Sequence, residues 1–460
     1  MFGQLVKSLL AKKKPAARPA PTEAEAQAAR HAVRMKAYHA QRAIYEARHA
    51  ELRAQFGATP GEQIEPLLEL AHLCYQLDLD EEGEAVLMQV LALDPDNPVA
   101  LCGLGLLLQT HGRFAESERA LRRALAIAPD ERTIRYGLAM ALMTRGNYPE
   151  GYALFAARLA GPVVQGAKIA ALPAWQGEAL DGKSIVLWSD WGGFGDDLAF
   201  MRYARVIRAR LQPARVVVAA PRPLVRLFAG QPYIDQAITL QDDAAADLQC
   251  SFIEAARVLG ITVDTVPAWP AYLQAPARAS AAWRARLAPE TQLKVGLAWQ
   301  GGAGEAGSEL TTARLDKHLN ADNLAALREL AGVRFVSLQK GGHAGRIAEM
   351  LPGAEAIDDT DALGDFADTA ALISQLDLVV AVDTAVAHLA GALGIPVLLL
   401  LKKSSAHFWL EERGDSPWYP SLRIARQPVH GDWATPMMQV RATLERMAAG
   451  TPWPICFGPA

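Results

Sequence analysis

The chain has 460 residues, too many for one ordinary domain, which predicts two to four domains. It is 51% hydrophobic and 21% charged, the composition of a globular protein. The formal net charge of -4 gives no electrostatic reason to expect a nucleic-acid partner. Cys74, Cys102, Cys250 and Cys456 show no C-x-x-C spacing, which argues against a zinc site or a disulfide framework.

The first 21 residues, MFGQLVKSLLAKKKPAARPAP, are predicted to form a disordered basic tail. The lysines follow the short apolar stretch rather than precede it, unlike a secretory signal. A weak amphipathic anchor on a membrane surface is the alternative interpretation. The apolar run at residues 376–401 is interrupted by Asp383, His388 and Pro396, so we do not expect it to span a membrane. We therefore expect a cytoplasmic protein, with at most weak peripheral contact to the membrane.

Residues 22–60 are predicted to form one long helix. Thr22 and Glu25 have the spacing of a capping box at its start. The segment is rich in alanine and charged residues and is polar around much of its surface. This composition predicts a helix that is solvated or binds a partner.

Residues 61–160 contain an internal repeat. The segments AVLMQVLALDP and RALRRALAIAP end at Pro95 and Pro129, 34 residues apart (129 − 95), and a third unit runs to Phe155. Small residues such as Gly105 allow two helices to approach closely, and a proline ends the second helix of each unit. The period and these positions resemble the tetratricopeptide repeat, three of which bury a stable core and offer a concave surface to another protein.

From about residue 171 the pattern changes to strands that alternate with helices. SIVLWSD, RVVVAAP and QAITL predict strands of a first domain at 171–275, with DDLAFMRYARVIRARL as one helix. A linker is expected at 273–290. LKVGLAWQG, VRFVSLQK, DLVVAVD and PVLLLL predict strands of a second domain at 290–460, with LNADNLAALREL as a helix. Two series of β-α units imply two parallel sheets that face a cleft, where ligands lie beyond the carboxyl ends of the strands.

Two of these strand ends carry glycines. Gly193 and Gly195 follow the first strand, and Asp196 and Asp197 open the next helix. Such a turn suits an anion at the helix N-terminus, although the aspartates are equally expected simply to cap the helix. The strand VGLAWQGG likewise ends at Trp299 before two glycines.

Two further strand ends carry a cation and an acid. Gln339 and Lys340 end FVSLQK, where a lysine is placed to meet a phosphate, or is simply an exposed loop residue. Asp383 and Thr384 lie where the strand DLVVAVD meets a helix, and His388 lies one turn further. Free N–H groups at that helix end predict a phosphate-bearing ligand, although a lone histidine on an apolar helix is more often a core residue.

Several blocks resemble a known enzyme family: GGFGDDLAFMRYA, VGLAWQGG, DFADTAALISQLDLVVAVDTAVAHLAGALGIPV and DSPWYPSLRIARQ. They are similar to the glycosyltransferase domain that follows tetratricopeptide repeats in bacterial proteins. That domain is related to the heptosyltransferases of glycosyltransferase family 9 and distantly to the O-linked N-acetylglucosamine transferases. The resemblance covers about residues 175–445. It implies the GT-B fold, two Rossmann-like domains facing a cleft, with the acceptor on the first domain and the donor on the second.

The resemblance also implies roles for individual residues. Asp196 matches the proposed catalytic base, which removes a proton from the acceptor hydroxyl. Donor binding is assigned on the same basis, together with the glycine-rich turns, to Gly193, Gly195, Trp299, Gln339, Lys340, Asp383, Thr384 and His388. No metal and no cofactor other than a nucleotide-sugar co-substrate is expected, so a lysine and helix N–H groups must stabilise the leaving phosphates. Asp190 and Asp197 remain rivals of Asp196.

Two loops depart from the family pattern and leave the sugar and the nucleotide open. GGAGEAGSELTTARLDKH follows Trp299, where Arg314 is the basic residue, and LKKSSAHFWLEERG starts at Leu401. The preferred hypothesis is transfer to a protein acceptor recruited by the repeats, with flagellin or another surface protein implied by the resemblance. The alternatives are transfer to a glycan or lipid-linked acceptor at the inner membrane, and a non-catalytic repeat scaffold.

Overall fold

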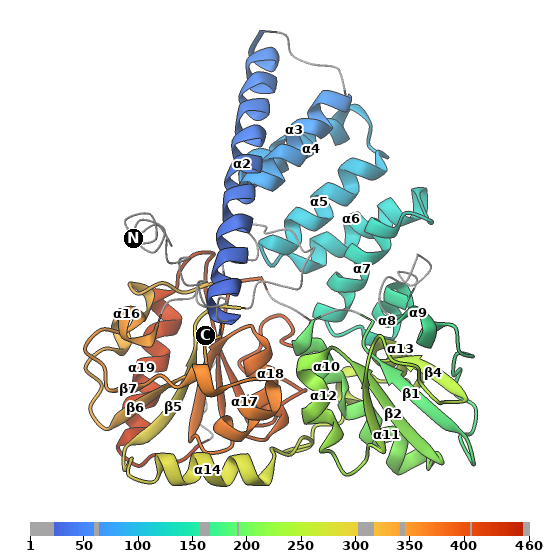
Figure 1. Cartoon of the computed structure of the whole chain (residues 1–460). Helices are drawn as coiled ribbons and strands as arrows, with labels where there is room; N and C mark the ends of the chain where they lie inside the picture. Colours follow the sequence, from blue (N-terminus) through green and yellow to red (C-terminus); the bar gives the residue numbers. More distant parts are fainter. Residues whose placement is uncertain are drawn as a thin grey trace, which may run out of the picture.

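The computed structural model describes residues 23–58, 64–156, 166–190, 193–301, 317–340, 346–404 and 407–453. The predicted tail at residues 1–21 and Arg314 lie outside these residues. A helical array stands above two α/β halves that lie side by side (Figure 1). Within the described residues, none of the helices combines the length and the apolar character that crossing a membrane requires.

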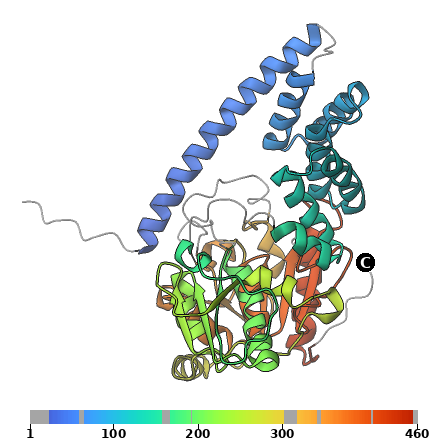
Figure 2. The same cartoon turned by 90° about the vertical axis from the view of Figure 1, so that its right-hand side faces the viewer.

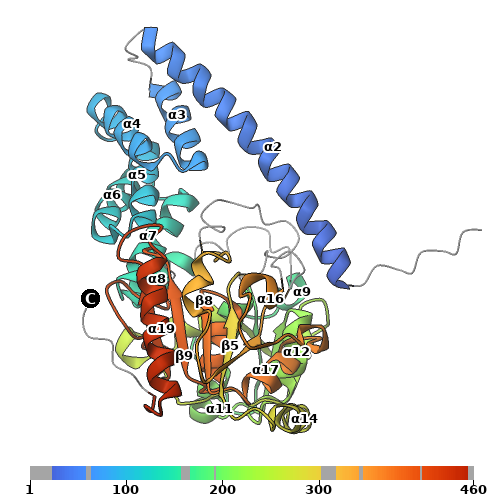
Figure 3. The same ribbon diagram turned by 90° about the vertical axis from the view of Figure 1, so that its left-hand side faces the viewer.

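The N-terminal part is entirely helical. A long helix, α2 (Glu23–Ala58), packs on the first of three helix pairs and diverges from the others along its length (Figures 2 and 3). The pairs are α3 (Ile64–Leu77) with α4 (Asp80–Leu93), α5 (Pro98–Thr110) with α6 (Phe114–Ile127), and α7 (Arg132–Thr144) with α8 (Tyr148–Ala156). A Cβ on Gly105 would lie 2.5 Å from Leu121, so close packing requires the small residue.

The first α/β half contains a four-stranded parallel sheet of order β3-β2-β1-β4. Its strands are β1 (Ser184–Trp188), β2 (Arg215–Ala220), β3 (Gln236–Thr239) and β4 (Leu248–Ser251). Its helices are α9 (Ala167–Ala170), α10 (Phe194–Phe200), α11 (Arg202–Leu211), α12 (Arg222–Ala229), α13 (Phe252–Val258) and the 3-10 turn η2 (Val263–Thr265). The single helix expected after β1 is therefore two helices, which meet at Met201. Strand β4 was not predicted.

The second half contains a six-stranded parallel sheet of order β10-β9-β8-β5-β6-β7. Its strands are β5 (Leu293–Ala298), β6 (Val333–Ser337), β7 (Ala356–Ile357), β8 (Leu378–Val382), β9 (Val397–Leu401) and β10 (Leu422–Arg426). Its helical elements are η3 (Asn323–Leu327), α16 (Ile347–Met350), η5 (Thr360–Ala362), α17 (Phe366–Ile373), α18 (Ala385–Ala392) and α19 (Ala434–Ala448). The predicted fold class, helical repeats followed by two parallel-sheet domains, is confirmed.

Two local predictions in this region are wrong. The expected linker at 273–290 contains a helix, α14 (Ala277–Leu287), because Trp283 and Leu287 lie one turn apart and both are buried in the core. The expected helix in LNADNLAALREL is the short 3-10 segment η3. There Asn320 and Asn323 exchange side-chain to backbone hydrogen bonds of 2.9 and 3.0 Å, which compete with regular helix formation.

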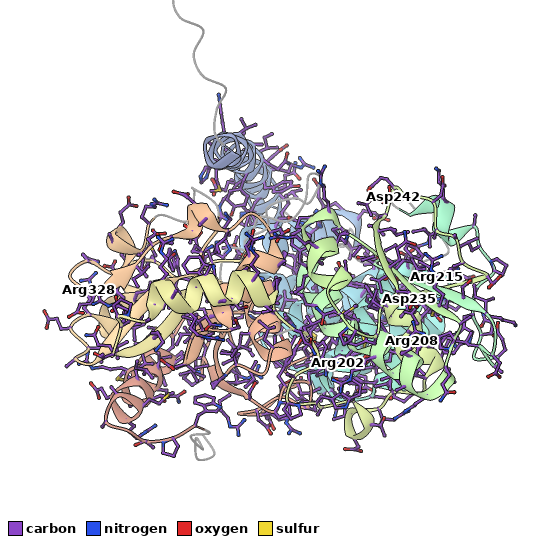
Figure 4. All side chains as sticks on the ribbon, turned by 60° about the horizontal axis from the view of Figure 1, so that its bottom comes forward. Arg202, Arg208, Arg215, Asp235, Asp242 and Arg328 are labelled. Carbon is purple, nitrogen blue, oxygen red and sulfur yellow. The ribbon has the colours of Figure 1, made fainter. Side chains whose placement is uncertain are left out.

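One hydrophobic core joins the three parts of the molecule. It contains residues of α7 and α8, of the first sheet and its helices, and of the second half. Arg202, fully buried at the start of α11, donates hydrogen bonds to the carbonyls of Pro267 and Trp418 and lies over the rings of Tyr272 and Trp418. Figure 4 places Arg202 between the two halves. These contacts fix both halves and the third repeat as one unit.

Candidate active site

The first strand end presents Asp196 at the start of α10. Strand β1 ends at Trp188, and Gly193 is the N-cap of α10 in an extended conformation. A Cβ on Gly195 would lie 2.8 Å from Cδ2 of His388, so the glycine is required by the close approach of α18 from the other half. The first turn of α10 therefore packs directly against α18, and Asp196 lies at the boundary between the halves.

The facing strand end presents Asp383. Strand β8 ends at Val382, and Thr384 caps α18 by accepting a hydrogen bond of 3.2 Å from the Val386 N–H. Trp409 Nε1 donates to Asp383 Oδ1 at 3.0 Å, and Lys317 Nζ donates to the Asp383 carbonyl at 2.9 Å. The carboxylate is thus held at the amino end of α18 with a lysine beside it, an arrangement that suits an anionic ligand.

A cavity of about 530 Å³ brings these groups together. Asp196, Asp383 and Lys317 line it, and Lys402, Ser404 and His407 from the loop after β9 complete its polar wall. The remaining wall comes from β9, α10, α13 and the helical repeats: Tyr75, Leu106, Gln109, Thr110, Phe114, Tyr136, Met140, Met143, Thr144, Tyr152, Phe155, Phe200, Ile253, Leu400 and Leu401. All three parts of the molecule therefore contribute to one cavity.

The electrostatics of the cavity single out Asp196. Burial raises the pKa of its carboxyl from 3.8 to about 7, and the neighbouring carboxylates of Asp383 and Asp190 add to this shift. The positive charge of Lys317 lowers the pKa of Asp196 and so partly offsets this shift. A carboxyl with a pKa near 7 is matched to general-base catalysis at neutral pH.

The two rivals of Asp196 occupy different environments. Asp197 is 2% exposed and points into the protein from the same turn of α10. Asp190 is half-buried just after β1 and acts on Asp196 by raising its pKa. Neither lines the cavity, so the geometry favours Asp196 among the three aspartates.

His388 is placed in the interior rather than in the cavity. It is 4% exposed, its Nδ1 lies 2.8 Å from the Tyr419 hydroxyl, and burial lowers the pKa of the imidazole to about 4. Its ring packs between Phe408 and Trp409. His388 therefore packs between α10 and α18 and does not line the cavity, and its predicted contact with the donor stays a prediction.

Three other predicted donor-binding residues also have structural partners. Trp299 is fully buried in the core of the second half and does not line the cavity, and its role in donor binding stays a prediction. Gln339 accepts hydrogen bonds from the Trp299 and Gln300 N–H groups at 3.0 and 2.9 Å, which ties β5 to β6. Lys340 Nζ donates to the carbonyls of Thr360 and Leu363 at 2.9 and 2.6 Å and does not line the cavity.

The sequence prediction missed Lys317, Trp409 and His407. Lys317 is the lysine that the structure places beside Asp383 in the cavity wall, where Lys340 was expected. It follows β5 by about twenty residues in the loop that departs from the family pattern, and no strand end marks it. Trp409 and His407 lie in the second departing loop, where the sequence carries several aromatic residues without any spacing rule.

Comparison with known proteins agrees with this architecture. Residues 312–431 match the family model of glycosyltransferase family 9 (heptosyltransferase), and residues 99–131 match that of the tetratricopeptide repeat. Protein FlbA of Caulobacter vibrioides is 27% identical over 333 residues, which are 65% of this chain and 53% of that protein. The chain thus spans about half of the length of this relative.

Two solved structures are similar to the α/β part. The glycosyl transferase family 9 protein of Veillonella parvula DSM 2008 is 12% identical, with a TM-score of 0.45, over 60% of this chain and 100% of that one. The ADP-heptose lps heptosyltransferase II of E. coli is 15% identical, with a TM-score of 0.41, over 57% and 99%.

The fold and the cavity define a tetratricopeptide-repeat protein with a GT-B-type pair of α/β domains. The segment that matches the model of glycosyltransferase family 9 (heptosyltransferase) lies within the second of these domains.

Proposed function

We propose that this chain transfers a sugar from a nucleotide-sugar donor to a protein acceptor bound by the repeats, without a metal ion. One observation carries the proposal. A carboxyl with a pKa of about 7, Asp196, faces Asp383, Lys317 and the amino end of α18 across a cavity whose third wall is the repeat array.

The reaction needs one base and one stabilised leaving group. Asp196 takes the proton of the acceptor hydroxyl while the oxygen of that hydroxyl forms a bond to the anomeric carbon of the sugar. The bond from that carbon to the phosphate oxygen breaks, and the nucleotide leaves with the negative charge. Lys317 and the N–H groups at the start of α18 stabilise this charge. They supply the positive field that a metal ion provides in other transferases, which is why we propose metal-independent transfer.

The acceptor proposal is based on a second cavity, of about 550 Å³, along the repeats. Its wall is mainly apolar and comes from α3, α4, α5 and α7. Tyr75 and Leu106 line both this groove and the catalytic cavity, so the two are adjacent. We propose that a segment bound along the groove extends past these residues to Asp196. Flagellin or another bacterial surface protein is the first acceptor to test, as the family resemblance implies.

Point mutations test acceptor binding in the groove. Deleting the repeats would not, because the third helix pair is part of the core shared with the α/β halves. Tyr75→Glu places a charge where the groove meets the cavity, and Met88→Glu is the matched control on α4, 54% exposed and outside both cavities. Transfer to the protein acceptor should fall about tenfold or more in Tyr75→Glu, while donor hydrolysis by water is unchanged. Equal transfer by both variants contradicts acceptor binding in the groove and favours a glycan or lipid-linked acceptor.

A further inference from the structure

The loop after β9 supports the cavity through Trp409, whose indole donates to Asp383 Oδ1 at 3.0 Å. Just beyond Trp409 the backbone passes through two left-handed residues, Leu410 and Glu412, with φ of 50° and 55°. This conformation is unfavourable for residues that carry a Cβ, and it persists only where surrounding contacts hold it. The position of Trp409 therefore depends on what holds the segment 407–412.

Part of this support comes from the second half itself. Arg426 of β10 donates hydrogen bonds to the carbonyls of Trp409 and Leu410 at 3.4 and 2.7 Å. The Ser416 hydroxyl donates to the Phe408 carbonyl at 2.8 Å. These contacts fix one side of the segment 407–412 to β10 and to the loop that precedes it.

The other side of the segment is held by a buried tyrosine of the third repeat. Tyr148, the first residue of α8, is fully buried and does not line the cavity. Its hydroxyl donates to the His407 carbonyl at 3.3 Å and accepts from Trp418 Nε1 at 2.7 Å. The hydroxyl thus joins two segments of the second half to the repeat array.

The carboxyl end of α7 adds two contacts to the same segment. The Glu411 N–H donates to the Thr144 carbonyl at 3.2 Å. Thr144 is the last residue of α7, and carbonyls at that end of a helix have no partner within it. Arg145, the C-cap, pairs with the Glu411 carboxylate at 3.2 Å and also with Glu118 of α6. The third repeat therefore holds the turn at its backbone and at a side chain.

We propose that Tyr148 and Arg145 are positioning residues for donor binding. By fixing the segment 407–412 on the third repeat, they place the Trp409 indole on the Asp383 carboxylate. This inference rests on the proposed function, in which Asp383 and the amino end of α18 lie at the donor. The third repeat is then part of the donor site, in addition to the contact of the repeats with the acceptor.

The test measures donor affinity in two matched variants. CMP, UDP, ADP and GDP sugars are screened with wild type, and the one that binds best is titrated by calorimetry. Tyr148→Phe and Tyr233→Phe each remove one buried hydroxyl; that of Tyr233 donates to the Tyr272 carbonyl at 2.7 Å, away from the cavity. Both should lower the unfolding midpoint. Only Tyr148→Phe should raise the Kd of the nucleotide sugar, by about 3–10-fold.

A double-mutant cycle separates positioning from a general loss of structure. Trp409→Phe removes the indole donor and should raise the same Kd about tenfold. If Tyr148 acts through Trp409, the variant with both substitutions should bind no more weakly than Trp409→Phe alone. Independent effects would multiply to about 30–100-fold, and this result overturns the positioning role.

Arg145→Met gives a second variant that leaves the core intact, should Tyr148→Phe not fold. Arg145 is partly exposed, so the loss in donor affinity should be about twofold. Arg113→Met is the matched control in the second repeat, where Arg113 pairs with Glu84 and Glu116 at 2.7 and 2.8 Å. It should bind the nucleotide sugar as wild type does. Equal affinities in the two arginine variants contradict the inference for Arg145.

The outcomes separate this inference from the proposed function. A wild type that binds none of the nucleotide sugars overturns both. A wild type that binds one of them, with an unchanged Kd in Tyr148→Phe and Arg145→Met, overturns only the positioning role. If these variants raise KM for the protein acceptor and leave the Kd of the nucleotide sugar unchanged, the third repeat acts on the acceptor alone, and its assignment to the donor site is wrong.

Discussion

The two strand ends that line the cavity have a similar local design, but their aspartates have different neighbours. In each, a parallel strand leads into a helix with an aspartate at its amino end: Asp196 in the first turn of α10, and Asp383 just before Thr384, the N-cap of α18. Asp383 accepts a hydrogen bond from Trp409, and Lys317 lies at its carbonyl. Asp196 is half-buried beside these groups, and its pKa rises to about 7. Topology alone therefore does not decide which carboxyl is the base; the residues around it do.

The largest effect is expected from replacing Asp196, the proposed base. Asp196→Asn should lower kcat for transfer by about 10²–10⁴-fold, because an amide cannot accept the proton. Donor affinity, measured by the nucleotide-induced shift of the unfolding midpoint, should change little. Asp197→Asn is the control on the same turn, and an equal loss of kcat in both variants would contradict the assignment.

The next largest effect is expected from replacing Lys317, the lysine beside Asp383. Lys317→Met should lower kcat by about 10²–10³-fold, because the leaving phosphate loses its cation. Lys340→Met is the matched control and should keep near-normal kcat, since its ammonium is bound to the carbonyls of Thr360 and Leu363. Steady-state kinetics of the two variants side by side decide which lysine acts on the donor.

A smaller effect concerns the support of Asp383. Trp409→Phe removes the indole donor to Oδ1 and should cost about 1–2 kcal/mol, or roughly tenfold in donor affinity. Titration of the unfolding midpoint with the nucleotide that wild type binds would measure this. Donor affinity equal to wild type would show that the 3.0 Å hydrogen bond does not position Asp383.

The last expected effect is on the stability of the folded state. The carboxyl of Asp196 binds more protons in the folded state between about pH 4 and 7, because its pKa is raised from 3.8 to about 7. The free energy of unfolding therefore falls as pH rises through this interval. Asp196→Asn removes this dependence and should be more stable than wild type by about 1–3 kcal/mol at pH 8. Denaturant unfolding at pH 5 and pH 8 measures the difference, and a variant that is less stable at pH 8 contradicts it.

The sequence predicted the features that depend on periodicity. The local sequence pattern predicts the helix pairs, whose period of 34 residues separates Pro95 from Pro129. It also predicts the strands that end in glycine or aspartate. Asp196 and Asp383 were found because parallel strands present their carboxyl ends at one edge of a sheet.

The sequence could not predict contacts between distant segments. Whether His388 points at a ligand or at Tyr419, and whether Lys340 or Lys317 reaches the cavity, depends on tertiary packing. The same holds for Tyr152, which reaches the cavity only because the third repeat is bound to Trp418 through Tyr148. The local sequence around these residues does not indicate which partner or cavity each side chain reaches.

The pH dependence of kcat/KM for sugar transfer, measured in EDTA, tests the central claim most directly. This quantity reports the pKa of the essential base in the free enzyme. The account predicts a rate that rises about tenfold per pH unit below pH 7 and levels above it, and a profile without this step in Asp196→Asn. Transfer that requires an added metal ion, or a profile in Asp196→Asn identical to that of wild type, would contradict it.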